Sequence, residues 1–278
     1  MKTSNLNKFS NLKQRVIVAA IGAPIVLLAT YFGEWTFFSI FFIICLISQL
    51  EFYNLSGLDG MHPLKFWGIF TGIVLFSFSF FIQAGMLDLK FMYLIFPMGA
   101  VIFFIKLYKK LESKPFTNIA YTFLGILYVA VPFALLNTLA FIHGQYAYEL
   151  IFGIMFLIWA SDTGAYFIGV RFGRKKLFER VSPNKSWEGF IGGLVTSLLV
   201  SLGIAYFFPI LPVWQWVIIS ILAVSAGTYG DLVESLFKRS IFIKDSGGIL
   251  PGHGGFLDRF DALILAIPFV VAFVKLVN

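Results

Sequence analysis

The sequence predicts an all-α polytopic membrane protein with about nine transmembrane helices. Composition carries the first part of this prediction: of 278 residues, 59% are hydrophobic and only 13% are charged, and the mean hydropathy is +0.88. A soluble domain has about a quarter of its residues charged. The apolar residues also fall in repeated runs of about 20, the length that a helix needs to cross a bilayer.

These apolar runs are expected to form the helices in chain order. Each is long enough for a hydrocarbon core of about 30 Å at a rise of about 1.5 Å per residue. Several contain proline, which membrane helices tolerate where neighbouring helices satisfy the freed backbone groups. The runs are continuous rather than alternating, which disfavours a barrel. The expected helices cover residues 15–33, 35–54, 64–84, 89–107, 118–141, 149–170, 188–208, 213–231 and 258–277.

Positive charges are distributed unevenly between the loops. With the N-terminus in the cytoplasm, all but Lys90 and Lys275 of the 21 Lys and Arg residues fall in segments on the cytoplasmic side. Cytoplasmic segments of membrane proteins carry such an excess, and a wrong helix count would remove it. The pattern predicts a multi-pass protein of the inner cell membrane, with a cytoplasmic N-terminus and active site. For the N-terminal tail and the 106–114 cluster, the alternative is that the charge only sets topology and contacts anionic lipid heads.

Residues 1–142 are expected to act as an anchor or scaffold. The first four helices are rich in Phe and almost free of internal charge. Cys45 is the only cysteine in the sequence, so it cannot form an internal disulfide and is interpreted as a small packing residue. Glu51, at the end of the second expected helix, is interpreted as an interfacial carboxylate. The catalytic region is therefore expected in residues 143–278.

An acidic residue interrupts the sixth expected helix. Asp162 lies near the middle of "FLIWASDTGAYFIGVRFG", next to Ser161. An ionisable side chain within a membrane helix indicates a functional site that faces the bundle interior or a wet cavity. The alternative is a structural carboxylate that bonds to neighbouring helices. Gly164 and Gly169 would allow another helix or a ligand to approach closely.

A strongly basic segment follows, "RFGRKKLFERVSPNKSWEG". Its Arg and Lys residues are separated by turn residues, which suits a polyphosphate or an anionic lipid head, although setting topology is part of its role. The stretch "SPNKSWEG" leads into a helix start, and a helix N-terminus can bind phosphate. The candidate substrate-binding residues here are Arg174, Lys175, Lys185 and Ser186.

The eighth expected helix ends in "AGTYGDLVESLFKRSIFIKD". If the helix continues past residue 231, Asp231 and Glu234 share a face. Lys238 follows Glu234 by four positions, so a simple ion pair is the alternative to a functional role for Glu234.

The glycine-rich stretch "SGGILPGHGG" precedes the last helix. Glycine lets backbone N–H groups approach an anion, so a ligand-wrapping loop that includes Gly254 and Gly255 is favoured over a flexible linker. His253 is interpreted as a phosphate contact or a buttress of the loop.

Two aspartates, Asp258 and Asp261, lie three positions apart on the following helix, so both can aim at one ion. With Asp231, three carboxylates could converge at the cytoplasmic membrane boundary. Hard oxygen ligands without a nearby cysteine point to Mg²⁺ rather than Zn²⁺. Carboxylates for a divalent cation, basic side chains and a glycine loop suit phosphoryl or nucleotidyl transfer.

The stretch "SLFKRSIFIKDSGGILPGHGGFLDRFD" (235–261) resembles the signature of the phosphatidate cytidylyltransferases, or CDP-diacylglycerol synthases. That signature reads S-x-apolar-K-R, four residues, K-D-x-small, two residues, apolar, P or G, x, H-G-G-apolar-x-D-R-apolar-D, and every position matches. The segment "WASDTGAYFIG…FGRKKL…SPNKSWEG" is also similar to a second region of that family, with "SPNKSWEG" in place of "SPKKTWEG".

The resemblance implies that CTP and phosphatidate react to give CDP-diacylglycerol and pyrophosphate in phospholipid biosynthesis. It implies a homodimer embedded among membrane lipids, with a polar cavity that faces the cytoplasm and no nucleic-acid partner. It also implies Mg²⁺, with a second cation left open. By the resemblance, Asp231, Asp258 and Asp261 would bind the metal, and Lys238, Arg239 and Lys244 would bind phosphates. The 174–186 loop would bind the nucleotide and the lipid head group. The implied catalytic residues are Asp231, Lys238, Asp258 and Asp261.

Two other functions compete with this one. A different membrane transferase could use an isoprenoid phosphate or a CDP-alcohol, but the CDP-alcohol type would carry D-G-x-x-A-R, which this sequence lacks. An ion-coupled transporter could use Asp162 and the interrupted glycine-rich segment as a translocation path. Against a transporter, the charges cluster at one face and no pair of broken helices repeats in the two halves.

Overall fold

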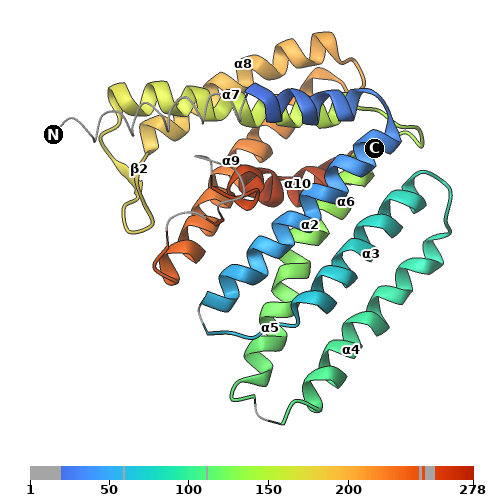
Figure 1. The fold of residues 1–278 in the computed structure, drawn as a ribbon. Coiled ribbons are helices and arrows are strands. Elements are labelled where there is room, and N and C mark those ends of the chain that lie inside the picture. The colour runs from blue at the N-terminus through green and yellow to red at the C-terminus, as the bar shows by residue number, and fades with distance from the viewer. Residues whose placement is uncertain (1–19, 59, 111, 244–245, 248–253) are drawn as a thin grey trace.

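The computed structural model describes residues 20–58, 60–110, 112–243, 246–247 and 254–278 (Figure 1). Within them, eight helices are long and apolar enough to cross a membrane, and a shorter apolar helix covers Ala20–Tyr31. The predicted all-α, multi-pass membrane fold is confirmed. The elements are α2 (Glu34–Leu58), α3 (Lys65–Gln83), the 3₁₀ turn η1 (Leu89–Leu94), α4 (Ile95–Leu107), α5 (Pro115–Gly125), the π turn η2 (Ile126–Ala130), α6 (Val131–Ala140), α7 (Glu149–Phe172), β1 (Lys176–Phe178), β2 (Ser182–Ser186), α8 (Trp187–Phe207), α9 (Val213–Ser240) and α10 (Leu257–Val277).

The expected count of nine spans is approximate. The helix expected at 15–33 begins outside the described residues, and its described part is Ala20–Tyr31. The helix expected at 118–141 is one apolar rod, Pro115–Ala140, with the π turn η2 in its middle. Pro132 has no N–H to donate to the carbonyl of Tyr128 four residues earlier, so a regular α-helical bond is missing where the π turn forms.

Helix α9 continues to Ser240, beyond its expected end at residue 231. The apolar run stops near 231, but buried side chains continue at helical spacing with Glu234 and Lys238. Their ion pair spans one helical turn, with 2.6 Å between Lys238 Nζ and Glu234 Oε2. The extension places Asp231, Glu234 and Lys238 on one continuous helix.

Helices α7 and α8 pack side by side and lie across one end of the molecule in Figure 1. Helix α10 packs against both α9 and α6, and so links this layer to the remaining helices. A Cβ on Gly164 would lie 2.3 Å from Thr196 Oγ1 of α8, so the close approach expected at Gly164 is confirmed. A Cβ on Gly169 would make only an ordinary contact, 3.6 Å from the Cα of Gly189.

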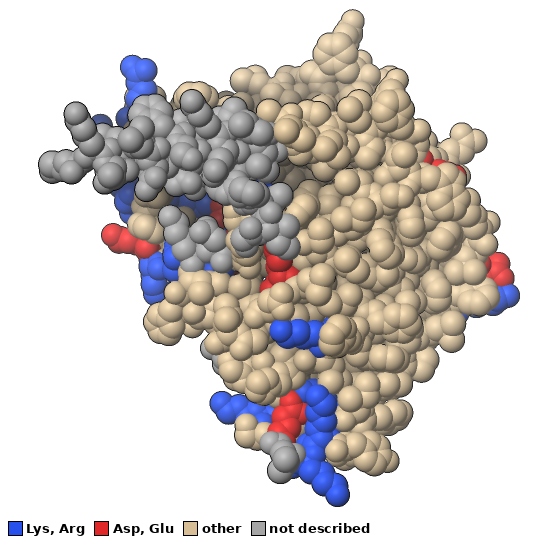
Figure 2. Space-filling view, in the orientation of Figure 1, with Lys and Arg blue, Asp and Glu red and all other residues tan. Residues whose placement is uncertain are grey.

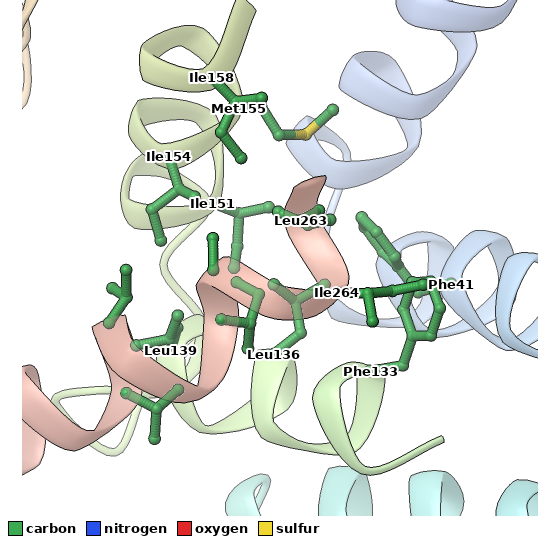
Figure 3. Close-up of a cluster of buried hydrophobic side chains, with 14 of the residues drawn as sticks. Phe41, Phe133, Leu136, Leu139, Ile151, Ile154, Met155, Ile158, Leu263 and Ile264 are labelled. Atoms are coloured by element: carbon green, nitrogen blue, oxygen red, sulfur yellow. The ribbon is translucent and has the colours of Figure 1, made fainter. Parts of the chain in front are cut away.

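Both halves of the chain share one hydrophobic core. In Figure 3, Phe41 of α2 and Phe133 of α6 converge with Ile264 of α10, and Ile151 and Met155 of α7 belong to the same cluster. A separate domain would have a core of its own. The division at residue 142 therefore describes where chemistry is expected and not two independently packed units.

Charged side chains gather at two places on the face seen in Figure 2, whereas most of that face is uncharged. One place is the end of the molecule where α4 meets α5. There Lys106 is buried and forms an ion pair with Glu112, so this lysine is not a lipid-facing topology charge. The other lies beside the antiparallel β1–β2 hairpin, which pairs Lys176 with Ser186 in the segment expected to be a loop.

Candidate active site

Lys185 of β2 stands among three acidic residues from three helices. Its Nζ lies 2.8 Å from Asp231 Oδ2 of α9 and 3.5 Å from the carbonyl oxygen of Thr228. It also attracts Asp162 of α7 and Asp261 of α10 electrostatically. We call Asp162, Lys185, Asp231 and Asp261 the Lys185 cluster. All four were predicted from the sequence as site residues, and the structure brings them together.

The close packing of α9 on α10 places two acids of this cluster next to each other. Gly230 has no side chain, and a Cβ at this position would lie 2.5 Å from the backbone oxygen of Asp261. Asp231 and Asp261 are thus near enough for their carboxylates to repel. Ser235 Oγ donates to Asp231 Oδ1 at 3.1 Å, which fixes the Asp231 carboxylate on α9.

The Lys185 cluster is buried on one side and open on the other. The Asp261 side chain lies in the protein interior, with 8% of the residue exposed. The side chains of Asp231 and Lys185 are 42% and 27% exposed, and Asp162 is exposed on α7. A polar ligand can therefore reach the pair Asp231–Asp261 from the α7 and hairpin side.

A second charged cluster lies farther along α9. Lys238 Nζ is 2.6 Å from both Glu234 Oε2 and Asp258 Oδ1, and all three side chains are nearly buried. The other oxygen of Asp258, Oδ2, accepts the backbone N–H groups of Ser246 at 3.0 Å and Gly255 at 2.9 Å. We call Glu234, Lys238 and Asp258 the Lys238 cluster. It joins α9 to both described ends of the glycine-rich loop.

The predicted convergence of Asp231, Asp258 and Asp261 on one metal ion is not present. Within the described part of the chain, no group of three or more His, Cys, Asp or Glu residues is placed to hold a metal ion. The physical reason is that both oxygens of Asp258 are engaged, one by Lys238 and the other by loop amides. The three-residue spacing to Asp261 suggested a shared target, but Asp258 lies in the first turn of α10 and bonds to the loop before it.

Asp231 and Asp261 alone still suit a magnesium ion. Mg²⁺ in phosphate-transfer sites is usually held by one or two carboxylates, with substrate phosphates and waters completing the shell. The two carboxylates repel each other on facing helices, and Lys185 supplies the nearest ion-pair partner of Asp231. A divalent cation would relieve that repulsion, so the donor set fits the predicted metal with two protein ligands instead of three.

Glu51 is a residue of the candidate site whose contacts the sequence interpretation missed. It lies in the protein interior and not on the surface, because only 3% of the residue is exposed. Its Oε2 accepts the backbone N–H of Leu257 at 2.8 Å and the hydroxyl of Ser246 at 3.4 Å. A Cβ on Gly255 would lie 2.3 Å from the same oxygen, so glycine is required beside this carboxylate. The one available signal was a charged residue inside an otherwise apolar helix.

The hairpin positions the remaining predicted basic residues at the surface. Glu188 accepts the backbone N–H groups of Arg174 at 3.0 Å and Lys175 at 3.2 Å, which leaves both side chains exposed. Ser186 is the N-cap of α8, since its Oγ accepts the N–H of Gly189 at 3.1 Å. Substrate contact by these three residues stays a prediction.

The other predicted residues lie at the C-terminal end of α9 and in the glycine-rich loop. Arg239 is exposed, and its Nη1 donates to the carbonyl of Ile243 at 3.1 Å. Gly254 adopts a left-handed φ of 80°, a conformation that favours glycine. Lys244 and His253 lie outside the described residues.

The sequence profile described as "Cytidylyltransferase family" matches residues 13–277. The chain belongs to this family. This chain is 45% identical over 132 residues to a protein of Haemophilus influenzae named "Phosphatidate cytidylyltransferase", and the alignment covers 46% of this chain and 45% of the relative. It is 42% identical over 154 residues to a protein of that name from Staphylococcus saprophyticus, 55% of this chain and 58% of the relative. A third, from Staphylococcus haemolyticus, is 32% identical over 262 residues, 92% of this chain and 96% of the relative.

The first two of these alignments cover less than two thirds of the relative, whereas the third covers nearly all of it. The two motif regions noted in the sequence meet in space. One lies on α7 and the hairpin, and the other on the end of α9 and the start of α10. The ion pair between Lys185 and Asp231 joins them.

Proposed function

We propose that this membrane protein transfers CMP from CTP to phosphatidate, giving CDP-diacylglycerol and pyrophosphate in phospholipid biosynthesis. The relatives named above carry that activity in their names. The observation that carries the proposal is the Lys185 cluster, in which paired carboxylates meet a lysine of the hairpin. The exposed Arg174 and Lys175 directly precede the same hairpin. This arrangement offers carboxylates that can bind a cation and positively charged side chains that can bind phosphates.

The reaction needs little proton chemistry from the protein. A phosphate monoester is largely ionised near neutral pH, because its second pKa is about 6. A phosphatidate oxygen attacks the α-phosphorus of CTP, and the bond from that phosphorus to the bridging oxygen of the β-phosphate breaks. The electron pair leaves with pyrophosphate. The remaining tasks are alignment of the two anions and stabilisation of charge on the leaving group.

Each basic residue of the site has a task in this scheme. Lys185 lies closest to the acid pair and orients a phosphate there. Arg174 and Lys175 on the exposed hairpin bind the outer phosphates of CTP or the lipid head group. Lys238, held between Glu234 and Asp258, keeps the ends of the loop in place. Lys244 and Arg239 remain candidate phosphate contacts.

Asp231 and Asp261 would hold Mg²⁺, and Asp258 would not. When bound, the ion would supply charge neutralisation to the triphosphate. Without an ion, Lys185 balances the charge of Asp231 in the same place. The lysine thereby prevents the two acids from standing uncompensated near the apolar interior.

The orientation in the membrane follows from the charge distribution. The proposed site lies on the cytoplasmic side of the inner cell membrane, because nearly all Lys and Arg residues fall in segments assigned to that side. The homodimer rests on the family resemblance alone.

The experiment is a measurement of pyrophosphate release by the purified protein in detergent. Release is expected only when CTP, Mg²⁺ and phosphatidate are all present. Diacylglycerol, which lacks the attacking phosphate, serves as the matched lipid control. An absence of release, or equal release with diacylglycerol, would reject the proposal, and ion flux in proteoliposomes would then favour the transporter.

A further inference from the structure

Tyr128 carries a buried hydroxyl that the site described so far does not use. Its Oη is inaccessible to solvent and has no hydrogen-bond partner among the described residues. A buried phenol normally finds a partner, because an unpaired buried polar group destabilises the fold. The residue therefore keeps its hydroxyl at a cost to stability.

The backbone places Tyr128 beside the acids of the active site. It lies in the π turn η2, which packs against α10 and α2, and π turns occur often at functional sites. Its ring centroid is 6.0 Å from that of Phe52, and Phe52 stacks on Phe237 of α9 at 5.3 Å. The turn that carries Tyr128 thus packs against α10, and Phe52 links Tyr128 to Phe237 of α9.

Acids of the two clusters act on this phenol: Asp261, Glu234 and Asp231 all interact with it electrostatically. None of the three accepts its hydrogen, although a phenol donates readily to a carboxylate. A buried O–H donor that is left unpaired within the field of an acid pair suits an anion that would bind between the acids and their cation.

A nearby tyrosine shows what a purely structural phenol looks like in this protein. Tyr53 of α2 is fully buried, and its Oη donates to the carbonyl of Thr122 at 2.7 Å. Tyr53 and Tyr128 both pack against Phe52. The two residues thus share an environment but differ in whether the protein satisfies the hydroxyl.

We propose that Tyr128 is a further substrate-contacting residue, whose hydroxyl donates to a phosphoryl oxygen bound at Asp231 and Asp261. This inference rests on the proposed function. The phosphate can belong to CTP or to the lipid, since both present the same acceptor. The N-terminal half would then contribute directly to binding, through a residue that the π turn at Pro132 positions.

The test compares Tyr128→Phe with Tyr53→Phe. The first variant removes an unpaired hydroxyl, so its thermal unfolding midpoint should equal or exceed that of the wild type, while kcat/KM should fall on the order of 10- to 100-fold. The second removes a paired hydroxyl, so its midpoint should fall while kcat/KM of the folded protein stays within a factor of two. A rise in KM for CTP alone would identify the triphosphate as the partner, and a rise in KM for phosphatidate alone would identify the lipid.

The outcomes separate this inference from the proposed function. If the wild type turns over and Tyr128→Phe matches it in kcat/KM, only the role of Tyr128 is rejected. A fall in the unfolding midpoint of Tyr128→Phe like that of Tyr53→Phe would show a structural partner and would also reject it. A wild type without turnover, and without stabilisation by CTP, would reject both.

Discussion

Glu51 of α2 accepts the backbone N–H of Leu257, the first residue of α10, although 206 positions separate them in the sequence. The same carboxylate oxygen accepts the hydroxyl of Ser246. Both described ends of the glycine-rich loop are therefore fixed by a residue from the N-terminal half. The helices expected to act as an anchor or scaffold thus hold the loop of the candidate active site in place.

Replacement of Glu51 by Ala should destabilise the protein. The change leaves the N–H of Leu257 and the hydroxyl of Ser246 without their acceptor in a buried setting, which costs about 1–3 kcal/mol. Thermal unfolding in detergent should show a lower midpoint. Glu34→Ala, at the start of the same helix, is the control and should change the unfolding free energy by less than about 0.5 kcal/mol. Equal effects of the two changes would contradict the anchoring role.

Asp261→Asn and Asp258→Asn should have different effects. Asp261 is proposed to hold Mg²⁺, so its loss should lower kcat on the order of 100-fold or more without lowering the unfolding midpoint, because it also removes a repulsion. Asp258 holds Lys238 and two loop amides, so Asp258→Asn should lower the midpoint and leave the Mg²⁺ concentration for half-maximal activity unchanged. A large shift of that concentration in Asp258→Asn would restore the three-carboxylate site.

Lys185→Gln should weaken substrate binding. The substitution removes the ion-pair partner of Asp231, which also faces Asp261. We expect KM for CTP or phosphatidate to rise on the order of 10-fold. Lys90→Gln is the control: Lys90 also pairs with an aspartate, Asp88, but both side chains are 69% exposed, and such pairs contribute about 0–1 kcal/mol. Unchanged KM values for both substrates in Lys185→Gln would remove this lysine from the site.

Gly230→Ala should force α9 and α10 apart. The added Cβ would lie 2.5 Å from the backbone oxygen of Asp261, so overpacking should cost about 1–3 kcal/mol and also displace an acid of the site. Gly203→Ala in α8 is the matched control, because among the described residues no atom outside its own helix backbone lies within 4 Å of the added Cβ. That control should be stable or more stable, since alanine favours helices over glycine by about 0.5–1 kcal/mol. A stable and active Gly230→Ala would show that the close approach is dispensable.

The sequence predicted the individual members of the Lys185 cluster but not all their contacts. Asp162, Asp231 and Asp261 stood out because a carboxylate in an apolar helix is costly, and Lys185 because it lies in a basic segment. The pairing of Lys185 with Asp231 depends on the hairpin, whose strands are short and charged and show no alternation of polar and apolar residues. Local patterns cannot indicate which of several acids such a hairpin will reach.

The errors also have local physical causes. The end of α9 was misplaced because hydropathy falls at residue 231, whereas a buried ion pair extends the helix. Asp258 was grouped with Asp261 because helical spacing gives a shared direction, but a residue in the first turn can bond to the loop before it. Glu51 was underestimated because its partners lie far away in the sequence.

The length of α9 has a consequence for the geometry of catalysis. Its 28 residues extend roughly 42 Å at about 1.5 Å each, more than the hydrocarbon thickness of about 30 Å. If α9 stands close to the membrane normal, its final turns, with the Lys238 cluster, lie at the depth of the lipid head groups. The proposed diacyl substrate would then present its phosphate to the protein there while both acyl tails stay dissolved in the bilayer, and only the proposed nucleotide would have to arrive from water.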